Sequence, residues 1–243
     1  MCSGADSGYH GCMTYVLHYA PDNASMIVRM ALDHAGVAYR TALVDRARRQ
    51  QESAAYRKLN PHGLIPALET PQGAIFETGA ILLWLVDAHD GLGPKAEDPG
   101  RGAFLAWLFH LSNTTHATLR QMFHAEDYIA PRSAPALRRG IARRLKKEFG
   151  QLNDLLATDP AWLGAETPTV LDFYLCALLR WSALYPDAGQ AGWFNLDHYP
   201  ALARMCAQVE TLECTAQLAR AEGMGPAPFT RPEPPNPPEG SPT

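Results

Sequence analysis

Residues 59–69 read LNPHGLIPALE, and the organisation of the chain can be worked out from this stretch. Pro61 and Gly63 indicate a turn, because proline fixes φ and glycine tolerates positive φ. A short apolar run follows, with Pro66 in its middle. Since proline cannot donate to a sheet ladder, we expect Pro66 to begin an edge strand after a cis peptide bond that turns the chain tightly. Ile65 would then offer its backbone N–H and C=O groups to a partner outside the sheet.

The next stretch supplies the second half of such a site. Residues 71–73 (PQG) indicate a hairpin turn, and residues 74–76 form a second short strand. Glu77 and Thr78 stand where a helix begins, because apolar side chains follow at helical spacing. A helix N-terminus attracts carboxylates, Thr78 can add a hydroxyl, and Glu77 can hold an ammonium group. Together with strand-like bonding at Ile65, this predicts a site for a short peptide with a free α-amino-acid end.

The two motifs, Asn-Pro-x-Gly-x-Ile-Pro-x-Leu and then Glu-Thr-x-Ala-Ile, occur in the order found in a known family. They resemble the glutathione-binding half of the cytosolic glutathione S-transferases, and the bacterial type in particular. The resemblance implies an α/β thioredoxin-like N-terminal domain followed by an all-α C-terminal domain. It also implies that glutathione, a co-substrate, binds through the backbone of Ile65 beside cis Pro66. Glu77 and Thr78 would hold its γ-glutamyl end, with Thr78 in place of the commoner serine.

The order of elements before this stretch is consistent with that fold. A strand, a helix and a second strand are predicted in succession, which indicates a parallel pair joined by a crossover. A short helix then precedes the turn at Pro61. The expected ranges are 14–19 and 39–44 for the strands, and 24–35 and 52–59 for the helices.

The second half of the chain carries helix signals without competing strands. Thr169, followed by Asp172 and an apolar run, predicts a capping box that opens a buried helix. The same residues resemble the family's folding signature, and we give Asp172 a structural role only. Three further helices are expected, over residues 104–123, 138–156 and 199–221.

These signals divide the chain into five parts. Residues 1–12 are expected to be a flexible N-terminus, and Met13 could be an alternative start. The Pro-rich end is expected to be disordered or extended. The predicted parts are 1–12, a glutathione-binding domain over 13–90, a linker over 91–100, a helical domain over 101–225 and a tail over 226–243.

Composition limits the classes of function. The net charge of −4 gives no general attraction to nucleic acid, and no apolar run is long enough for a membrane span. Residues 1–12 lack the apolar core of a signal peptide. The five cysteines are odd in number and lack C-x-x-C spacing, so we expect no disulfide framework, no metal site and a cytoplasmic location. Cys176 is expected to be a buried small hydrophobic residue.

The chemistry of glutathione conjugation requires a thiolate. A free thiol has a pKa of about 8.5 and is only slightly ionised at pH 7, so the protein must stabilise the anion. The loop after the first strand faces the required edge of the sheet. Ala24 stands where bacterial relatives with Cys-Ser have their cysteine, so a mixed disulfide with the protein is not expected. Ser25 is the first candidate donor, followed by Asn23 and Tyr19; the alternatives are a helix N-cap, a turn and simple packing, respectively.

Two histidines are further candidates for binding glutathione. His116 resembles a histidine in the long helix of bacterial members, where it lies near glutathione; the alternative is a half-buried helical histidine. His62 could reach the glycyl carboxylate, or it could be an exposed turn residue. A pocket for a hydrophobic co-substrate is expected between the domains, lined by Met122, Phe123 and Tyr128, which could equally be core.

Three functions remain open from the sequence. The first is a glutathione transferase acting on a hydrophobic electrophile, as in detoxification. The second keeps glutathione but changes the reaction to isomerisation, ether cleavage or disulfide reduction. The third is a non-catalytic transferase-like binding module. The resemblance also implies a homodimer; nucleic-acid and membrane partners are not expected.

Overall fold

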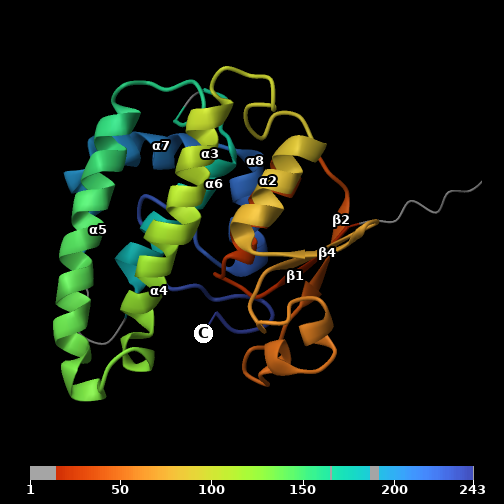
Figure 1. The fold of residues 1–243 in the computed structure, drawn as a ribbon, viewed down its shortest axis with the longest axis horizontal. Coiled ribbons are helices and arrows are strands. Elements are labelled where there is room, and N and C mark those ends of the chain that lie inside the picture. The colour runs from red at the N-terminus through yellow and green to blue at the C-terminus, as the bar shows by residue number, and fades with distance from the viewer. Residues whose placement is uncertain (1–14, 165, 187–191, 243) are drawn as a thin grey trace, which may run out of the picture.

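The computed structural model describes residues 15–164, 166–186 and 192–242, so the predicted flexible segment 1–12 lies outside the described residues. A sheet-containing domain is followed by a domain of helices (Figure 1). In chain order the first domain contains β1 (Tyr15–Tyr19), α1 (Ser25–His34), β2 (Tyr39–Leu43), the 3₁₀ turns η1 (Gln50–Glu52) and η2 (Tyr56–Lys58), β3 (Ala67–Thr70), β4 (Gly73–Phe76) and α2 (Thr78–Ala88).

The sheet confirms the predicted thioredoxin-like domain. Its strand order is β2-β1-β3-β4, and β1 pairs with β2 in parallel while β3 runs antiparallel to both of its neighbours. The short helix expected over residues 52–59 is instead the two 3₁₀ turns η1 and η2.

The predicted position of Pro66 was right in one respect and wrong in another. The Ile65–Pro66 peptide bond is cis, as predicted. The strand that follows is not an edge strand, however, because β3 lies between β1 and β4. Pro66 precedes Ala67, the first residue of β3, so its missing N–H removes no hydrogen bond from either ladder.

The helical domain follows the linker. Its elements are α3 (Arg101–His110), the π-helical segment η3 (Leu111–His116), α4 (Ala117–Phe123), η4 (Ala125–Asp127), η5 (Pro131–Ser133), α5 (Ala134–Leu156), α6 (Val170–Leu184), η6 (Leu196–His198), α7 (Pro200–Glu210) and α8 (Glu213–Glu222). The long helix expected over residues 104–123 is therefore a continuous run of α3, η3 and α4. Helix α5 begins four residues earlier than the expected 138–156.

The helix expected over residues 199–221 is broken into α7 and α8, which corrects the sequence prediction. The Thr211 hydroxyl donates to the Gln208 carbonyl at 2.7 Å, and the Thr215 hydroxyl donates to the Val209 carbonyl at 2.6 Å. Threonine hydroxyls that bond to nearby carbonyls compete with the helical backbone. These bonds therefore favour an end to α7 at this point.

The capping box at the start of α6 is confirmed. The Leu171 N–H donates to the Thr169 hydroxyl at 3.2 Å, and the Thr169 N–H donates to the Asp172 carboxylate at 2.7 Å. Helix α6 is buried over almost its whole length.

The two domains share one hydrophobic core. Helix α1 packs against α2 in its own domain and against α6 and α8 in the helical domain. The β1–α1 loop is therefore held between the domains. Among the described residues, no helix combines the length and apolar character needed to cross a bilayer.

The C-terminal segment, residues 226–242, differs from the expected disordered tail. It forms no helix or strand, but it folds back over the protein toward the gap between α4 and β1 (Figure 1). Phe229 is 1% exposed, and the Glu210 carboxylate accepts the N–H groups of Phe229 and Thr230, both at 2.7 Å. These contacts hold the segment as an extended chain, which is the other alternative that the sequence allowed.

Candidate active site

The sheet register brings three chain segments to the same end of the sheet. This end, where β1, β2 and β4 finish and β3 begins, is called the edge below. Ala67 of β3 lies opposite Phe76 of β4. Pro66 precedes Ala67 and Glu77 follows Phe76, so these two residues flank the same cross-strand pair. Tyr19 ends β1 at the same edge, because β1 pairs with β3 up to Ala67. The β1–α1 loop, the cis proline and the start of α2 consequently meet there, as the motifs predicted.

The turn before Pro66 holds the Ile65 backbone in place. The Leu64 carbonyl accepts the Tyr56 hydroxyl and the Asn60 side-chain amide, both at 2.8 Å. Ile65 is half-buried, and within the described part of the chain neither its backbone N–H nor its C=O has a hydrogen-bond partner. These two groups can therefore pair with an extended peptide.

The start of α2 presents a carboxylate beside free helix N–H groups. Glu77 is exposed and has φ 69°, and its side chain makes no capping hydrogen bond. A non-glycine residue in this conformation costs on the order of 1–3 kcal/mol, which the surrounding structure must supply. Thr78 is the first residue of α2 and is 7% exposed. The pair can hold an ammonium group and a carboxylate, respectively.

The three residues predicted as donors to the thiolate differ in how their polar groups are used. The Ser25 hydroxyl is buried, donates to the Ala20 carbonyl at 3.0 Å and accepts the Ala20 N–H at 3.3 Å. It therefore closes the β1–α1 loop, and the N-cap of α1 is Ala24 instead. The side-chain oxygen of Asn23 is buried and has no hydrogen-bond partner among the described residues.

Tyr19 faces the C-terminal segment. Its hydroxyl donates to the Glu239 carboxylate, and the Arg29 guanidinium lies 4.6 Å from the centre of its ring. Burial and, after it, the bond to Glu239 raise the pKa of Tyr19 to about 12. In this conformation the Tyr19 hydroxyl already donates its hydrogen bond to Glu239.

The two candidate histidines lie in different environments. His62 is exposed in the turn, with its ring 5.8 Å from the ring of Phe76. His116 ends the π-helical segment, and its Nδ1 lies 2.9 Å from the Tyr174 hydroxyl. Its ring is also 5.4 Å from the ring of Trp181. Although part of its surface remains accessible, burial and then the charge of Arg120 lower the pKa of His116 to about 4.

We expect His116 to stay neutral down to about pH 4, whereas histidine in the unfolded chain titrates near 6.5. Because its folded pKa is lowered, the native state binds fewer protons than the unfolded state between these values. The stability contribution of neutral His116 is therefore complete above pH 6.5 and is lost as the pH falls toward 4. NMR titration of the ring signals, with the protein in urea as control, checks this. A midpoint near 6.5 in the folded protein would contradict it.

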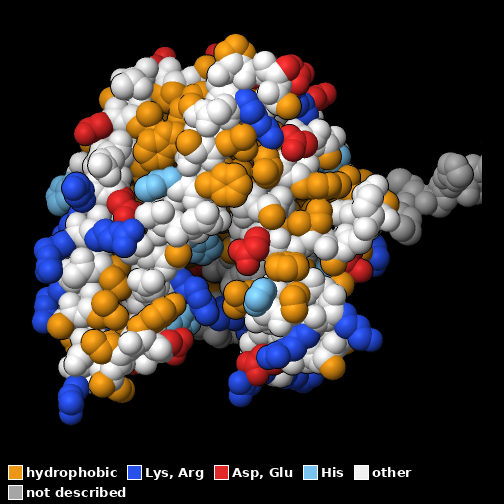
Figure 2. Space-filling view, in the orientation of Figure 1, with side chains coloured by type: hydrophobic (Ala, Val, Ile, Leu, Met, Phe, Trp, Pro, Cys, Tyr) orange, Lys and Arg blue, Asp and Glu red, His pale blue; other side chains and the backbone are white. Residues whose placement is uncertain are grey.

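The three residues expected to line a co-substrate pocket differ in burial and position. Met122 is fully buried in the core, whereas Tyr128 is 55% exposed. The ring of Phe123 lies 5.7 Å from the ring of Tyr185, near the junction of the domains. Figure 2 shows the molecule hollowed between the lower ends of the two domains, with Lys or Arg side chains inside the hollow.

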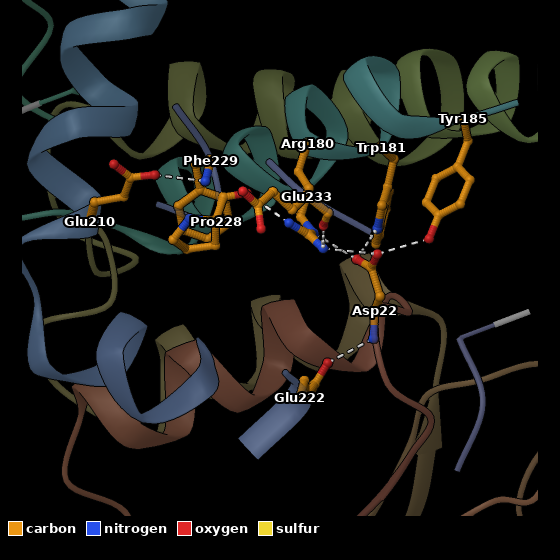
Figure 3. Close-up of polar contacts among 9 residues, drawn as sticks. All are labelled: Asp22, Arg180, Trp181, Tyr185, Glu210, Glu222, Pro228, Phe229 and Glu233. Carbon is orange, nitrogen blue, oxygen red and sulfur yellow. Dashed lines mark hydrogen bonds and ion pairs between the residues drawn. The ribbon is translucent and has the colours of Figure 1, made fainter. Parts of the chain in front are cut away.

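A buried polar network anchors the β1–α1 loop, and sequence reasoning missed it (Figure 3). The Asp22 carboxylate accepts two bonds from Arg180, at 2.9 and 3.2 Å, and the side chains of this ion pair are 0% exposed. The Trp181 indole N–H and the Tyr185 hydroxyl also donate to Asp22, both at 2.9 Å. The Asp22 N–H donates to Glu222 of α8 at 2.8 Å. A signal was present, because Arg180 stands within an apolar run and a buried arginine needs an acid.

Within the described ranges, no group of three or more His, Cys, Asp or Glu residues is arranged to hold a metal ion. The free cysteines of the described residues, Cys176, Cys206 and Cys214, are all buried.

Comparison with known proteins finds similarity to glutathione S-transferases. Residues 24–88 match the family model described as glutathione S-transferase, N-terminal domain. A glutathione S-transferase of Xanthomonas campestris pv. campestris is 26% identical over 168 residues, covering 68% of this chain and 81% of the relative. A disulfide-bond oxidoreductase of Escherichia coli K12 is 27% identical over 216 residues, covering 86% of this chain and 96% of the relative.

The solved structures agree with the sequence relatives. A sphingomonad glutathione S-transferase complexed with glutathione superposes with a TM-score of 0.70 at 25% identity, covering 85% of this chain and 98% of that one. The chain is therefore similar to the bacterial-type glutathione S-transferases, in its N-terminal domain by the family model and over most of its length in fold.

Proposed function

We propose that this protein binds glutathione and transfers it to an electrophilic hydrophobic small molecule. The observation that carries the proposal is the half-buried Ile65, whose backbone groups have no partner in the described part of the chain, beside the exposed Glu77 and the start of α2. An extended tripeptide with a free α-amino-acid end matches that arrangement. Its amino group would pair with Glu77 and its carboxylate with Thr78 and the helix N-terminus. His62 and His116 are the secondary candidates for contacts to glutathione.

The proposed reaction begins with loss of the thiol proton to solvent. The thiolate then attacks an electrophilic carbon, a carbon–sulfur bond forms, and a leaving group such as halide departs with its electron pair. We place Asn23 first as the donor that stabilises the thiolate. Its side-chain oxygen has no partner among the described residues, so its amide can reorient toward a ligand, whereas the Ser25 and Tyr19 hydroxyls already donate to Ala20 and Glu239.

Substitution of the loop residues tests this order. We expect Asn23→Ala to raise the pH at which bound glutathione ionises by about one unit, because a donor to the thiolate is worth roughly that much. Ser25→Ala should leave this pH unchanged and lower the free energy of unfolding by about 1–3 kcal/mol, since it leaves the buried Ala20 groups unpaired. Ultraviolet absorbance of the thiolate measures the ionisation. If Ser25→Ala alone raises the pH at which bound glutathione ionises, Ser25 becomes the first candidate again.

A second candidate function is disulfide reduction with two glutathione molecules. In that reaction, two glutathione thiols are oxidised to a disulfide and the substrate disulfide is reduced to two thiols. Ala24 stands where bacterial transferases that use Cys-Ser have their cysteine, and the described cysteines are buried, so both electrons would come from glutathione. The relative described as a disulfide-bond oxidoreductase supports keeping this candidate.

Calorimetry with glutathione, followed by turnover assays on an aryl halide and on a small disulfide, separates the alternatives. Binding with aryl-halide turnover supports the transferase. Binding with turnover of the disulfide alone supports the reductase, and binding without turnover of any substrate supports a non-catalytic module. No heat with millimolar glutathione would overturn the proposal. A homodimer and a cytoplasmic location remain part of it, tested by light scattering and by cell fractionation.

A further inference from the structure

Besides its contacts with Glu210, the C-terminal segment, residues 226–242, is attached to the protein at three further places. The first attachment is made by Arg180, whose guanidinium donates to the Pro228 carbonyl at 2.9 Å and to the Glu233 carbonyl at 3.0 Å (Figure 3). Arg180 also binds Asp22, so one buried side chain joins the β1–α1 loop and this segment. The second attachment is the Asn236 N–H, which donates to the carbonyl of Gly223, the residue after α8, at 2.8 Å.

The third attachment places the end of the segment on the edge of the sheet that carries the candidate site. Glu239 accepts the hydroxyl of Tyr19, the last residue of β1. Gly240 is so close that a Cβ there would lie 2.7 Å from Leu43, the last residue of β2, and 3.1 Å from Pro21. The Pro242 carbonyl accepts the Arg46 guanidinium. Residues 239–242 therefore lie on the β2–β1 half of this edge.

The proposed glutathione contacts occupy the other half of the same edge. In the strand order β2-β1-β3-β4, Ile65 and Pro66 lead into β3 and Glu77 follows β4. The β1–α1 loop, with Asn23, stands between the two halves. A thiol near that loop consequently has the glutathione-binding groups on one side and residues 239–242 on the other.

We propose that residues 239–242 form a wall of the second-substrate site and determine how large a group can be attached to the thiol. This inference rests on the proposed glutathione binding and adds a specificity determinant to it. With the wall in place, small electrophiles reach the sulfur. Removing the wall opens the β2–β1 half of the edge to larger apolar groups, including the apolar surface of Leu43 and Pro21.

A deletion of residues 237–243 tests the wall and keeps the contacts of Pro228, Glu233 and Asn236. The ligands are glutathione and S-hexylglutathione, measured by calorimetry on the full chain and on the variant. We expect the deletion to leave the Kd for glutathione within about twofold and to lower the Kd for S-hexylglutathione about tenfold. That gain corresponds to new burial of roughly two methylene groups.

Point variants provide a second test in case the deletion impairs folding. Gly240→Ala should displace the end of the segment and also favour S-hexylglutathione, because its Cβ would meet Leu43 and Pro21. Gly225→Ala is the matched control: its φ of 76° resembles the 77° of Gly240, but its Cβ would contact only the Glu233 carboxylate, at 3.6 Å. We expect this control to keep the ligand preference of the full chain.

The possible results separate this inference from the proposed function. If glutathione binds and neither the deletion nor Gly240→Ala changes the preference between the two ligands, the wall is refuted and the proposed function stands. The wall would also be refuted if Gly225→Ala changed the preference for S-hexylglutathione over glutathione as much as Gly240→Ala does. If glutathione fails to bind the full chain and every variant, the proposed function falls, and this inference falls with it.

Discussion

Arg180→Met should lower the free energy of unfolding by about 3–5 kcal/mol, which is the range observed when one partner of a buried ion pair is removed. The reason is that Asp22 would remain as a buried carboxylate without its countercharge, since the side chains of both partners are 0% exposed. The variant would also lose the bonds to the Pro228 and Glu233 carbonyls. Equilibrium unfolding in urea measures the change.

A surface pair in the same protein provides the control. Arg220 and Glu213 lie 3.0 Å apart, with side chains 67% and 72% exposed, so Arg220→Met should cost less than about 1 kcal/mol. In a double-mutant cycle, Asp22→Ala combined with Arg180→Met should cost about 1–3 kcal/mol less than the sum of the single changes. Additive costs, or an Arg180→Met variant no less stable than Arg220→Met, would show that this pair does not anchor the loop.

Glu77→Gly should have opposite effects on stability and on binding. Glycine adopts positive φ without steric cost, so relief of strain at φ 69° should raise the free energy of unfolding by about 1 kcal/mol, after the entropic cost of glycine. Loss of the carboxylate should raise the Kd for glutathione about 10- to 100-fold, as expected for a hydrogen bond to a charged group. Urea unfolding and calorimetry measure the two effects.

Glu77→Gln separates charge from backbone strain. Glutamine keeps the side-chain length and an acceptor oxygen, so its stability should match that of the original protein while its affinity for glutathione falls by a smaller factor. If both variants bind glutathione as tightly as the original protein, Glu77 does not contact the ligand. In that case, the strained conformation at residue 77 would need a different explanation.

Features that depend on neighbouring residues could be predicted from the sequence. The turn before Pro66, the cis peptide bond and the capping box at Thr169 each depend on a few adjacent side chains and backbone groups. Hydrophobic periodicity located most helices and strands for the same reason. The break between α7 and α8 was missed. The apolar residues there keep helical spacing, but the Thr211 and Thr215 hydroxyls donate to carbonyls near the end of α7.

The sequence by itself determined the resemblance to glutathione S-transferases and the thioredoxin-like order of elements, and it predicted a site for a short peptide at Ile65 and Glu77. Only the tertiary structure decided which loop donors are already bonded, and that residues 239–242 lie on the edge beside them. The pairing of Asp22 with Arg180 likewise joins residues 158 positions apart. Periodicity shows that a residue is buried, but the partner of a buried charge depends on how distant segments pack.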